Sequence, residues 1–254
     1  MVEFSATGTP LTKSDIDEVL DLIGAEAASL WAVLAVETSG SGFLSDRRSK
    51  ILFERHYFHR LTSGRFDSDY PDISSKSAGG YGPAGAHQYD RLMIALQLDE
   101  AAALQSASWG LGQIMGSHFA KLDYSTPVEM VETFARSEGE QLKAIAKFLM
   151  AEGLIDVLRK KDWAEFARVY NGPNYAINRY DEKLAKYYEI YSNGPLPDLK
   201  VRAAQLYLVY NGFQIAVDGT FGSATSEALR GYQIKNDLSV TGQLDEVTAA
   251  ALFV

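Results

Sequence analysis

Along most of the chain, apolar residues recur every three or four positions, which is the spacing of an amphipathic helix. One stripe begins at Ser14, with Asp17 at capping-box spacing, and is broken at Gly24; the next ends near Glu37. Further helices are expected to begin at Thr126-Pro127, Ser137, Asp162 and about Asn178. The segment 50–54 is the best candidate for a strand, so the pattern predicts a mainly α fold.

A short stiff linker is predicted at 193–199, where Pro195 and Pro197 follow a helix-stopping Gly194. It would separate a large domain, 1–192, from a small one, 200–254. Within the small domain the segment 215–229 recurs imperfectly as 238–252. Neither copy can bury its apolar face alone, so we expect both to pack on a helix over about 201–211 as a three-helix module.

The composition is that of a folded protein: 254 residues, 46% apolar and 22% charged, with no cysteine. Lys and Arg number 24 against 33 Asp and Glu, a net charge of −9, so a nucleic-acid partner is not expected. The segment 1–10 lacks the features of a signal peptide, and no apolar run approaches about 18 residues. We therefore expect a cytoplasmic chain that does not insert into a membrane.

The first candidate for chemistry is Glu37, which ends an apolar helix and is followed by the small residues 38–42. The negative end of the helix dipole and apolar neighbours would both raise the pKa of its carboxyl group. A carboxylic acid that is protonated near neutral pH is what glycoside cleavage needs as a general acid. The alternative is an ordinary surface glutamate at a helix end.

A second carboxylate, Glu54, lies in an apolar and aromatic run with His56 and Tyr57. Two carboxylates that flank a sugar bond can act as acid and as base or nucleophile. The alternative is an ion pair of Glu54 with Arg55 or Arg47. A metal site and cofactors are not expected, because the histidine pair 56 and 59 has no third ligand nearby.

Two glycine-rich segments could line a binding cleft. Residues 106–116 contain Ser108, Trp109 and Gln113 among glycines that let a ligand approach the backbone, and Trp109 could stack on a sugar. Residues 170–175 place Tyr170 and Asn171 at a helix end. Each could equally be a turn between core helices. The loop 68–85, with Tyr70 and Tyr81, could border the same cleft or be a solvated loop.

Together these segments resemble the lysozyme superfamily, and most closely the N-acetylmuramidase domain of modular phage endolysins, over about Leu11 to Tyr191. The motifs are Ala35-Val36-Glu37, Ile51-Leu52-Phe53-Glu54-Arg55-His56 and Ser108-Trp109-Gly110-Leu111-Gly112-Gln113-Ile114-Met115. The tail, with Val217-Asp218-Gly219-Thr220-Phe221-Gly222, looks like the common peptidoglycan-binding module. Its second copy departs from the pattern, because Thr241 replaces the usual Asp.

The resemblance implies a lysozyme-like α-helical catalytic domain that hydrolyses the β-1,4 bond between N-acetylmuramic acid and N-acetylglucosamine. It assigns Glu37 as the catalytic acid, Glu54 as the second carboxylate and Thr62, or neighbouring Ser63, as a third participant. The residues expected to bind substrate are Ser108, Trp109, Gln113, Tyr170, Asn171, Tyr57 and His56. Those expected to bind peptidoglycan in the module are Asp218, Gly219, Phe221 and Tyr232.

The expected partner is bacterial peptidoglycan, bound by a monomer that stays in the host cytoplasm until holin-type release to the cell wall. Two other functions remain open. A lytic transglycosylase would cleave the same bond with one carboxyl group, and a non-catalytic wall-binding or virion protein would need none. A peptidase or amidase lacks support, because the four histidines and absent cysteine give no zinc or thiol constellation.

Overall fold

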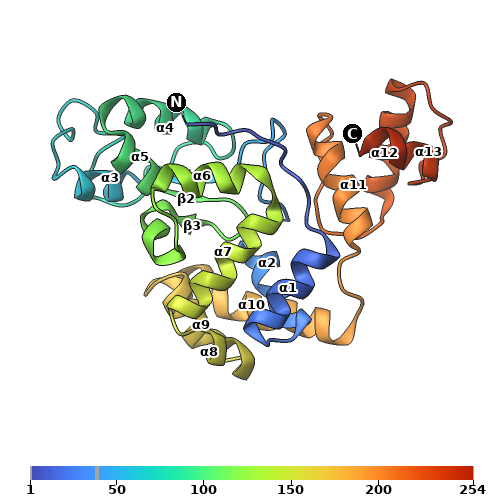
Figure 1. The fold of residues 1–254 in the computed structure, drawn as a ribbon, viewed down its shortest axis with the longest axis horizontal. Helices are drawn as coiled ribbons and strands as arrows, with labels where there is room; N and C mark the ends of the chain where they lie inside the picture. Colours follow the sequence, from blue (N-terminus) through green and yellow to red (C-terminus); the bar gives the residue numbers. More distant parts are fainter. Residues whose placement is uncertain (1, 38–39, 254) are drawn as a thin grey trace. The chain divides into compact units, whose positions relative to one another are not determined.

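A computed structural model describes residues 2–37 and 40–253, and it confirms a mainly α chain (Figure 1). The chain forms two compact units, one of 1–9 with 42–151 and one of 10–41 with 152–254. These units do not coincide with the domains 1–192 and 200–254, which stay a prediction. Thr38 and Ser39, from the small-residue segment after Glu37, lie outside the described residues.

The first unit combines helices with a small antiparallel sheet of order β1-β2-β3. Its strands are β1 (Ile51–Phe53), β2 (Ala107–Trp109) and β3 (Ile114–Met115). Its helices are α3 (Arg55–Leu61), α4 (His87–Leu98), α5 (Glu100–Gln105), the 3-10 helix η1 (Gly116–Leu122), α6 (Pro127–Arg136) and α7 (Glu138–Ala151). The strand expected at 50–54 is confirmed as β1. Leu52 lies opposite Ser108, so β1 and its carboxyl end are anchored to the glycine-rich segment.

Local capping signals predicted the starts of two helices of this unit, α6 and α7, correctly. The Thr126 side chain accepts the Glu129 N–H, and Pro127 occupies the first helical position of α6. The Ser137 hydroxyl accepts the Glu140 N–H at the start of α7. In both cases the signal lies within four residues, so the sequence alone was sufficient.

The second unit is helical in its described residues. Its elements are α1 (Lys13–Ile23), α2 (Ala27–Glu37), α8 (Ile155–Lys160), α9 (Trp163–Tyr170), the 3-10 helix η2 (Tyr175–Asn178), α10 (Tyr180–Asn193), α11 (Leu199–Tyr210), α12 (Ser223–Lys235) and α13 (Glu246–Leu252). Helix α2 is buried along most of its length and packs against α10. Among residues 2–37 and 40–253, no single helix is long and apolar enough to cross a membrane.

The predicted start of the first helix was wrong by two residues. The capping box of α1 is formed by Thr12 and Asp15, each accepting the other's backbone N–H, rather than by Ser14 and Asp17. Both pairs have the spacing of a capping box, and only Thr12 has the extended backbone that an N-cap residue requires. The predicted end of this helix is confirmed, because its C-cap residue Gly24 has a left-handed backbone conformation. The predicted N-cap of α9, Asp162, is confirmed as well.

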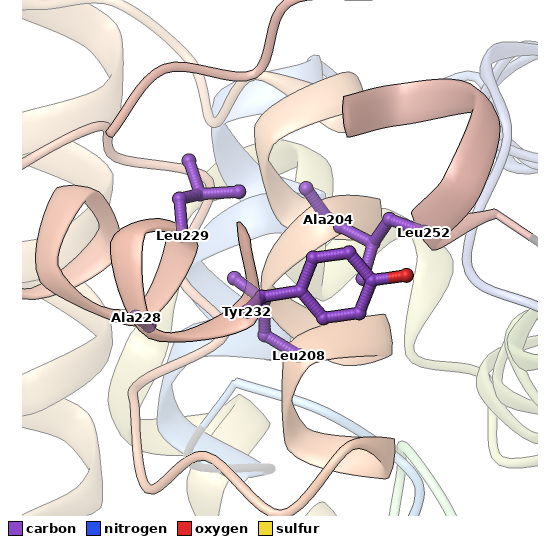
Figure 2. Close-up of a cluster of buried hydrophobic side chains, with 6 residues drawn as sticks. All are labelled: Ala204, Leu208, Ala228, Leu229, Tyr232 and Leu252. Atoms are coloured by element: carbon purple, nitrogen blue, oxygen red, sulfur yellow. The ribbon is translucent and has the colours of Figure 1, made fainter. Parts of the chain in front are cut away.

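Helices α11, α12 and α13 form the three-helix module expected from the repeat. Figure 2 shows its core, in which the Tyr232 ring lies among apolar side chains from the three helices. The core consists of Ala204, Leu208, Ala228, Leu229, Tyr232 and Leu252. Tyr232 is 4% exposed and its hydroxyl donates to the Ala251 carbonyl at 2.8 Å. The expectation that Tyr232 contacts glycan is therefore corrected: its ring is part of the module's core.

A buried glutamine organises the turn of each repeat. The Gln205 amide donates to Asp218 Oδ1 and to the Thr220 carbonyl, and its oxygen accepts the Gly219 N–H at 2.8 Å. In the second copy, Gln233 donates to Thr241 Oγ1 at 3.0 Å and accepts the Gly242 N–H. A hydroxyl at 241 therefore replaces the carboxylate at 218 as acceptor, which explains how the second copy keeps the same turn without Asp.

We expect Gln205→Leu to destabilise the module by about 3 kcal/mol or more, because it leaves several buried donors and acceptors without partners. Gln205 is 1% exposed, so water cannot replace the lost hydrogen bonds. Hydrogen exchange of the α11 and α12 amides measures the effect. The exposed Gln214→Leu is the matched control. Unchanged protection in Gln205→Leu would contradict the structural role of this amide.

Candidate active site

Glu37 is the last residue of α2, and residues from two segments much later in the chain, at 170–171 and 180–183, act on its carboxyl group. Asn171, the C-cap residue of α9, donates from Nδ2 to Glu37 Oε1 at 2.8 Å. Tyr170 and Tyr180 lie close enough for the Glu37 charge to raise the pKa of both phenols, alongside the effect of their burial. The predicted residues Glu37, Tyr170 and Asn171 are thus brought together, across 134 residues of sequence.

Burial raises the pKa of Glu37 from 4.5 to about 7. The hydrogen bond from Asn171 and the positive charge of Lys183 act in the opposite direction, but removal from water dominates. The second amide atom of Asn171, Oδ1, is buried and has no hydrogen-bond partner among the described residues. The site therefore combines a carboxylic acid that holds its proton near neutral pH with an acceptor available to a substrate N–H or O–H group.

Glu54 is the N-cap residue of α3 in the first unit, directly after β1. Its side chain is 14% exposed, and Oε2 lies 3.1 Å from His56 Nδ1. The pKa of Glu54 is raised overall, because burial outweighs the charges of His56 and Arg91 and the interaction with the Tyr81 hydroxyl, all of which lower it. Tyr81 belongs to the loop 68–85, so this loop borders the Glu54 site. Arg55, considered as an ion-pair partner of Glu54, instead donates from Nε to the Ser77 carbonyl at 3.1 Å.

The neighbouring aromatic residues of α3 are paired with each other and with cations. The rings of His56 and Tyr57 meet edge to face with centroids 4.9 Å apart, and the Arg60 guanidinium lies over Tyr57. His59 Nδ1 lies 2.7 Å from Asp67 Oδ2, so His59 and His56 have different carboxylate partners. His56 is thus a neighbour of the second carboxylate, and the substrate-binding roles of His56 and Tyr57 stay predictions.

Thr62 and Glu54 flank the same helix, α3. The two residues cap opposite ends of α3, eight residues apart, which corresponds to about 12 Å along a helix. The Thr62 side chain is 3% exposed, and its hydroxyl donates to the Phe58 carbonyl at 2.7 Å. The catalytic role of this hydroxyl, assigned by the resemblance to Thr62 or Ser63, stays a prediction. Ser63 follows it with a positive φ of 53°.

The glycine-rich segment forms β2, β3 and the turn between them. Ser108 Oγ donates to Gln113 Oε1, and Gln113 Nε2 donates to the Gly110 carbonyl, so these two predicted residues hold the turn. Trp109 is fully buried and its indole N–H donates to the Leu104 carbonyl. The interpretation of Trp109 as an exposed sugar platform is therefore corrected: the ring packs on Phe4 and Tyr89 in the core.

The residues predicted to bind peptidoglycan in the module have different surroundings. The Asp218 carboxylate accepts the Thr220 N–H as well as the Gln205 amide, and Gly219 has a φ of 72° with no room for a Cβ beside Pro197 and Asp198. Both support the turn of the first repeat. Phe221 is 40% exposed, so of the four predicted residues it offers the largest free apolar surface. Its contact with glycan stays a prediction.

A family model for N-acetylmuramidase matches residues 26–192, which include both carboxylates and their neighbours. The chain belongs to the N-acetylmuramidase family. A second model, for a peptidoglycan binding domain, matches residues 198–252 of this muramidase. The enzyme is thus a glycoside hydrolase with a peptidoglycan-binding module, as the sequence predicted.

A solved structure, the crystal structure of Burkholderia AP3 phage endolysin, is similar to the muramidase. The two share 39% identity with a TM-score of 0.66, over 72% of this chain and 71% of the other. A search of curated proteins gave no match.

Sequence reasoning missed the cations and amides that tune the two carboxylates of the muramidase. Lys183 acts on Glu37, and Arg91 acts on Glu54. Gln88 fixes the backbone next to Glu54 by accepting the Phe53 N–H at 3.0 Å. All three lie on helices whose polar residues look like an ordinary solvated face in sequence, so no local signal separates them from their neighbours.

We expect Asn171→Leu to move the alkaline limb of the muramidase pH profile to higher pH by about one unit. The general acid works only while protonated, so activity falls as pH rises through the pKa of Glu37. The Asn171 hydrogen bond lowers that pKa, and leucine removes the bond while still excluding water. The pH dependence of kcat measures the shift, with the exposed Asn174→Leu as control. A limb that stays in place or moves to lower pH would contradict this role of Asn171.

Proposed function

We propose that this muramidase hydrolyses the β-1,4 bond between N-acetylmuramic acid and N-acetylglucosamine, with Glu37 as the general acid. The observation that carries the proposal is the burial of the Glu37 carboxyl group beside Asn171, with a pKa of about 7. In the reaction the carboxyl proton passes to the leaving O4 of N-acetylglucosamine as the bond from C1 of N-acetylmuramic acid breaks. Water adds its oxygen to C1 and gives up a proton to one of the two carboxylates, which leaves a reducing muramic acid end.

Glu54 acts in this proposal as an ionised carboxylate, which either directs the water or supports the positive charge that develops on the sugar ring. His56 and Arg91 support this role, because both favour the charged form against the burial that raises the pKa of Glu54. Glu37 and Glu54 thus have different surroundings. Lys183 and the Asn171 amide act on Glu37, whereas His56, Arg91 and the Tyr81 hydroxyl act on Glu54. This difference matches an acid and a carboxylate with separate roles.

We propose further that the protein is a phage endolysin that acts as a monomer on the host cell wall after holin-type release from the cytoplasm. Its likeness to the AP3 phage endolysin supports this, as does the combination of a muramidase with a peptidoglycan-binding module. The module would raise the local enzyme concentration on an insoluble substrate. Nucleic acid and membrane are not among the proposed partners.

Mass spectrometry of the fragments released from purified peptidoglycan tests the reaction. We expect muropeptides with a reducing N-acetylmuramic acid end, which borohydride converts to muramitol. A 1,6-anhydro end, lighter by one water, would show a lytic transglycosylase instead. A reducing N-acetylglucosamine end would show cleavage of the other glycosidic bond, and release of no fragments would show a non-catalytic wall-binding protein.

A further inference from the structure

The loop between α3 and α4 has little regular structure of its own around Tyr81. Its neighbours Gly79, Gly80 and Gly82 all have positive φ, of 88°, 68° and 65°. No backbone helix or strand pairing holds residues 76–84. A side chain in such a segment has a defined position only where other groups fix the backbone. The Tyr81 phenol nevertheless acts on the Glu54 carboxylate, and each group shifts the pKa of the other.

Two side chains of α4 fix this loop by its carbonyl groups. Gln88 Nε2 donates to the carbonyls of Tyr81 and Pro83, each at 2.7 Å. Arg91 donates to the Tyr81 carbonyl at 3.2 Å and also to the Asp72 carbonyl. The Tyr81 carbonyl therefore accepts from both side chains, immediately beside the side chain that reaches Glu54.

The same two side chains also hold the residue before Glu54. Gln88 Oε1 accepts the Phe53 N–H at 3.0 Å, and Arg91 donates to the Phe53 carbonyl at 3.2 Å. Gln88 is 1% exposed, and its amide has a partner for its oxygen and two for its nitrogen. Gln88 and Arg91 of α4 thus connect the end of β1 to the loop.

We propose that Tyr81 is a positioning residue for Glu54, and that Gln88 and Arg91 keep the phenol and the carboxylate together by holding the backbone beside both. The proposal rests on the catalytic role proposed above for Glu54. Tyr81 would hold the Glu54 carboxylate in one orientation. A carboxylate oxygen is then already correctly placed when the water or the charged sugar ring reaches it.

The groups that face Glu54 act together on its ionisation. They are His56 from α3, Arg91 from α4 and Tyr81 from the loop, while Arg55 acts on Tyr81 itself. Burial raises the pKa of Glu54, and the Tyr81 hydroxyl is one of the groups that lower it. Loss of the hydroxyl therefore raises this pKa, so the Glu54 carboxylate becomes protonated at a higher pH than in the wild type.

Tyr81→Phe tests the proposal, because it removes the hydroxyl and keeps the ring. We expect the acid limb of kcat/KM to move to higher pH by about one unit, with a fall in kcat of about threefold to tenfold and little change in KM. Tyr70→Phe in the same loop is the control; Tyr70 is 40% exposed, and we expect the wild-type profile. A Tyr81→Phe variant with an unmoved acid limb overturns the proposal, whatever its melting temperature.

Gln88→Met tests the backbone clamp without removing a charge that acts on Glu54 directly. We expect a lower melting temperature and, in addition, a shift of the acid limb in the same direction as in Tyr81→Phe. A lower melting temperature with an unmoved limb would show a purely structural glutamine and overturn the clamp.

A carboxyl NMR titration of the resting enzyme separates this proposal from the proposed function. The signal of Glu54 is identified by its loss in Glu54→Gln, and its pKa is compared in wild type and Tyr81→Phe. A raised pKa in Tyr81→Phe together with full activity of Glu54→Gln supports the Tyr81 contact and removes the catalytic role of Glu54. An unchanged pKa together with an inactive Glu54→Gln overturns the positioning role alone.

Discussion

Glu37→Gln is expected to lower kcat on purified peptidoglycan by about 10³-fold, with the fold intact. The carboxamide keeps the shape of the side chain and an oxygen that can accept the Asn171 Nδ2–H, but it has no acidic proton for the leaving oxygen. General-acid catalysis contributes roughly 10² to 10⁴ to such reactions. Release of reducing ends near pH 6, where the wild-type carboxyl is protonated, measures the loss.

The same substitution is expected to stabilise the protein above neutral pH. The Glu37 pKa is about 7 in the folded chain against an ordinary 4.5, so the unfolded state loses its proton first as pH rises. The native state therefore loses stability as pH rises from the ordinary pKa to about 7. The loss reaches on the order of 3 kcal/mol once Glu37 is ionised in both states. Glutamine lacks this penalty. Thermal unfolding should show a more stable variant at pH 8 and no such difference below the ordinary pKa.

The exposed Glu189→Gln on α10 is the matched control and should retain wild-type activity and pH dependence. Wild-type clearing of cell walls by Glu37→Gln would refute the assignment of the acid. A variant that is inactive but also unfolded would fail the stability test, so activity and stability together distinguish a catalytic from a structural glutamate.

The second large effect is expected for Glu54→Gln, with a fall in kcat of about 10²-fold. The neutral amide can no longer attract a proton from water or support positive charge on the sugar ring. The change also removes the charge that faces His56 and Arg91. Steady-state kinetics with soluble muropeptide chains measure it without a contribution from wall binding, and Glu100→Gln, exposed at the start of α5, is the control.

A Glu54→Gln variant with wild-type kcat would leave Glu37 as the one carboxyl group required. Together with an anhydro product, that result would identify a transglycosylase. Loss of activity together with a reducing muramic acid product would support hydrolysis with two carboxylates.

Local signals predicted the start of a helix correctly where only one nearby residue could serve as its N-cap. Pro127 after Thr126 and Asp162 before α9 are examples. The start of α1 was wrong because Thr12 and Ser14 both have an acidic residue three positions later, and only the backbone conformation decides between them. Trp109 was interpreted as a sugar platform because sequence shows the chemistry of a side chain and not its burial.

The order of residues by itself determined three things about this muramidase: a carboxylate at the end of an apolar helix, a second in an aromatic run, and a repeated module. These follow from patterns within a few residues. Only the tertiary structure decided which groups surround the carboxylates, because Asn171 reaches Glu37 across 134 residues and Tyr81 reaches Glu54 through a loop held by α4. The pKa of a buried acid depends on those distant neighbours and on the exclusion of water, and neither is a property of local sequence.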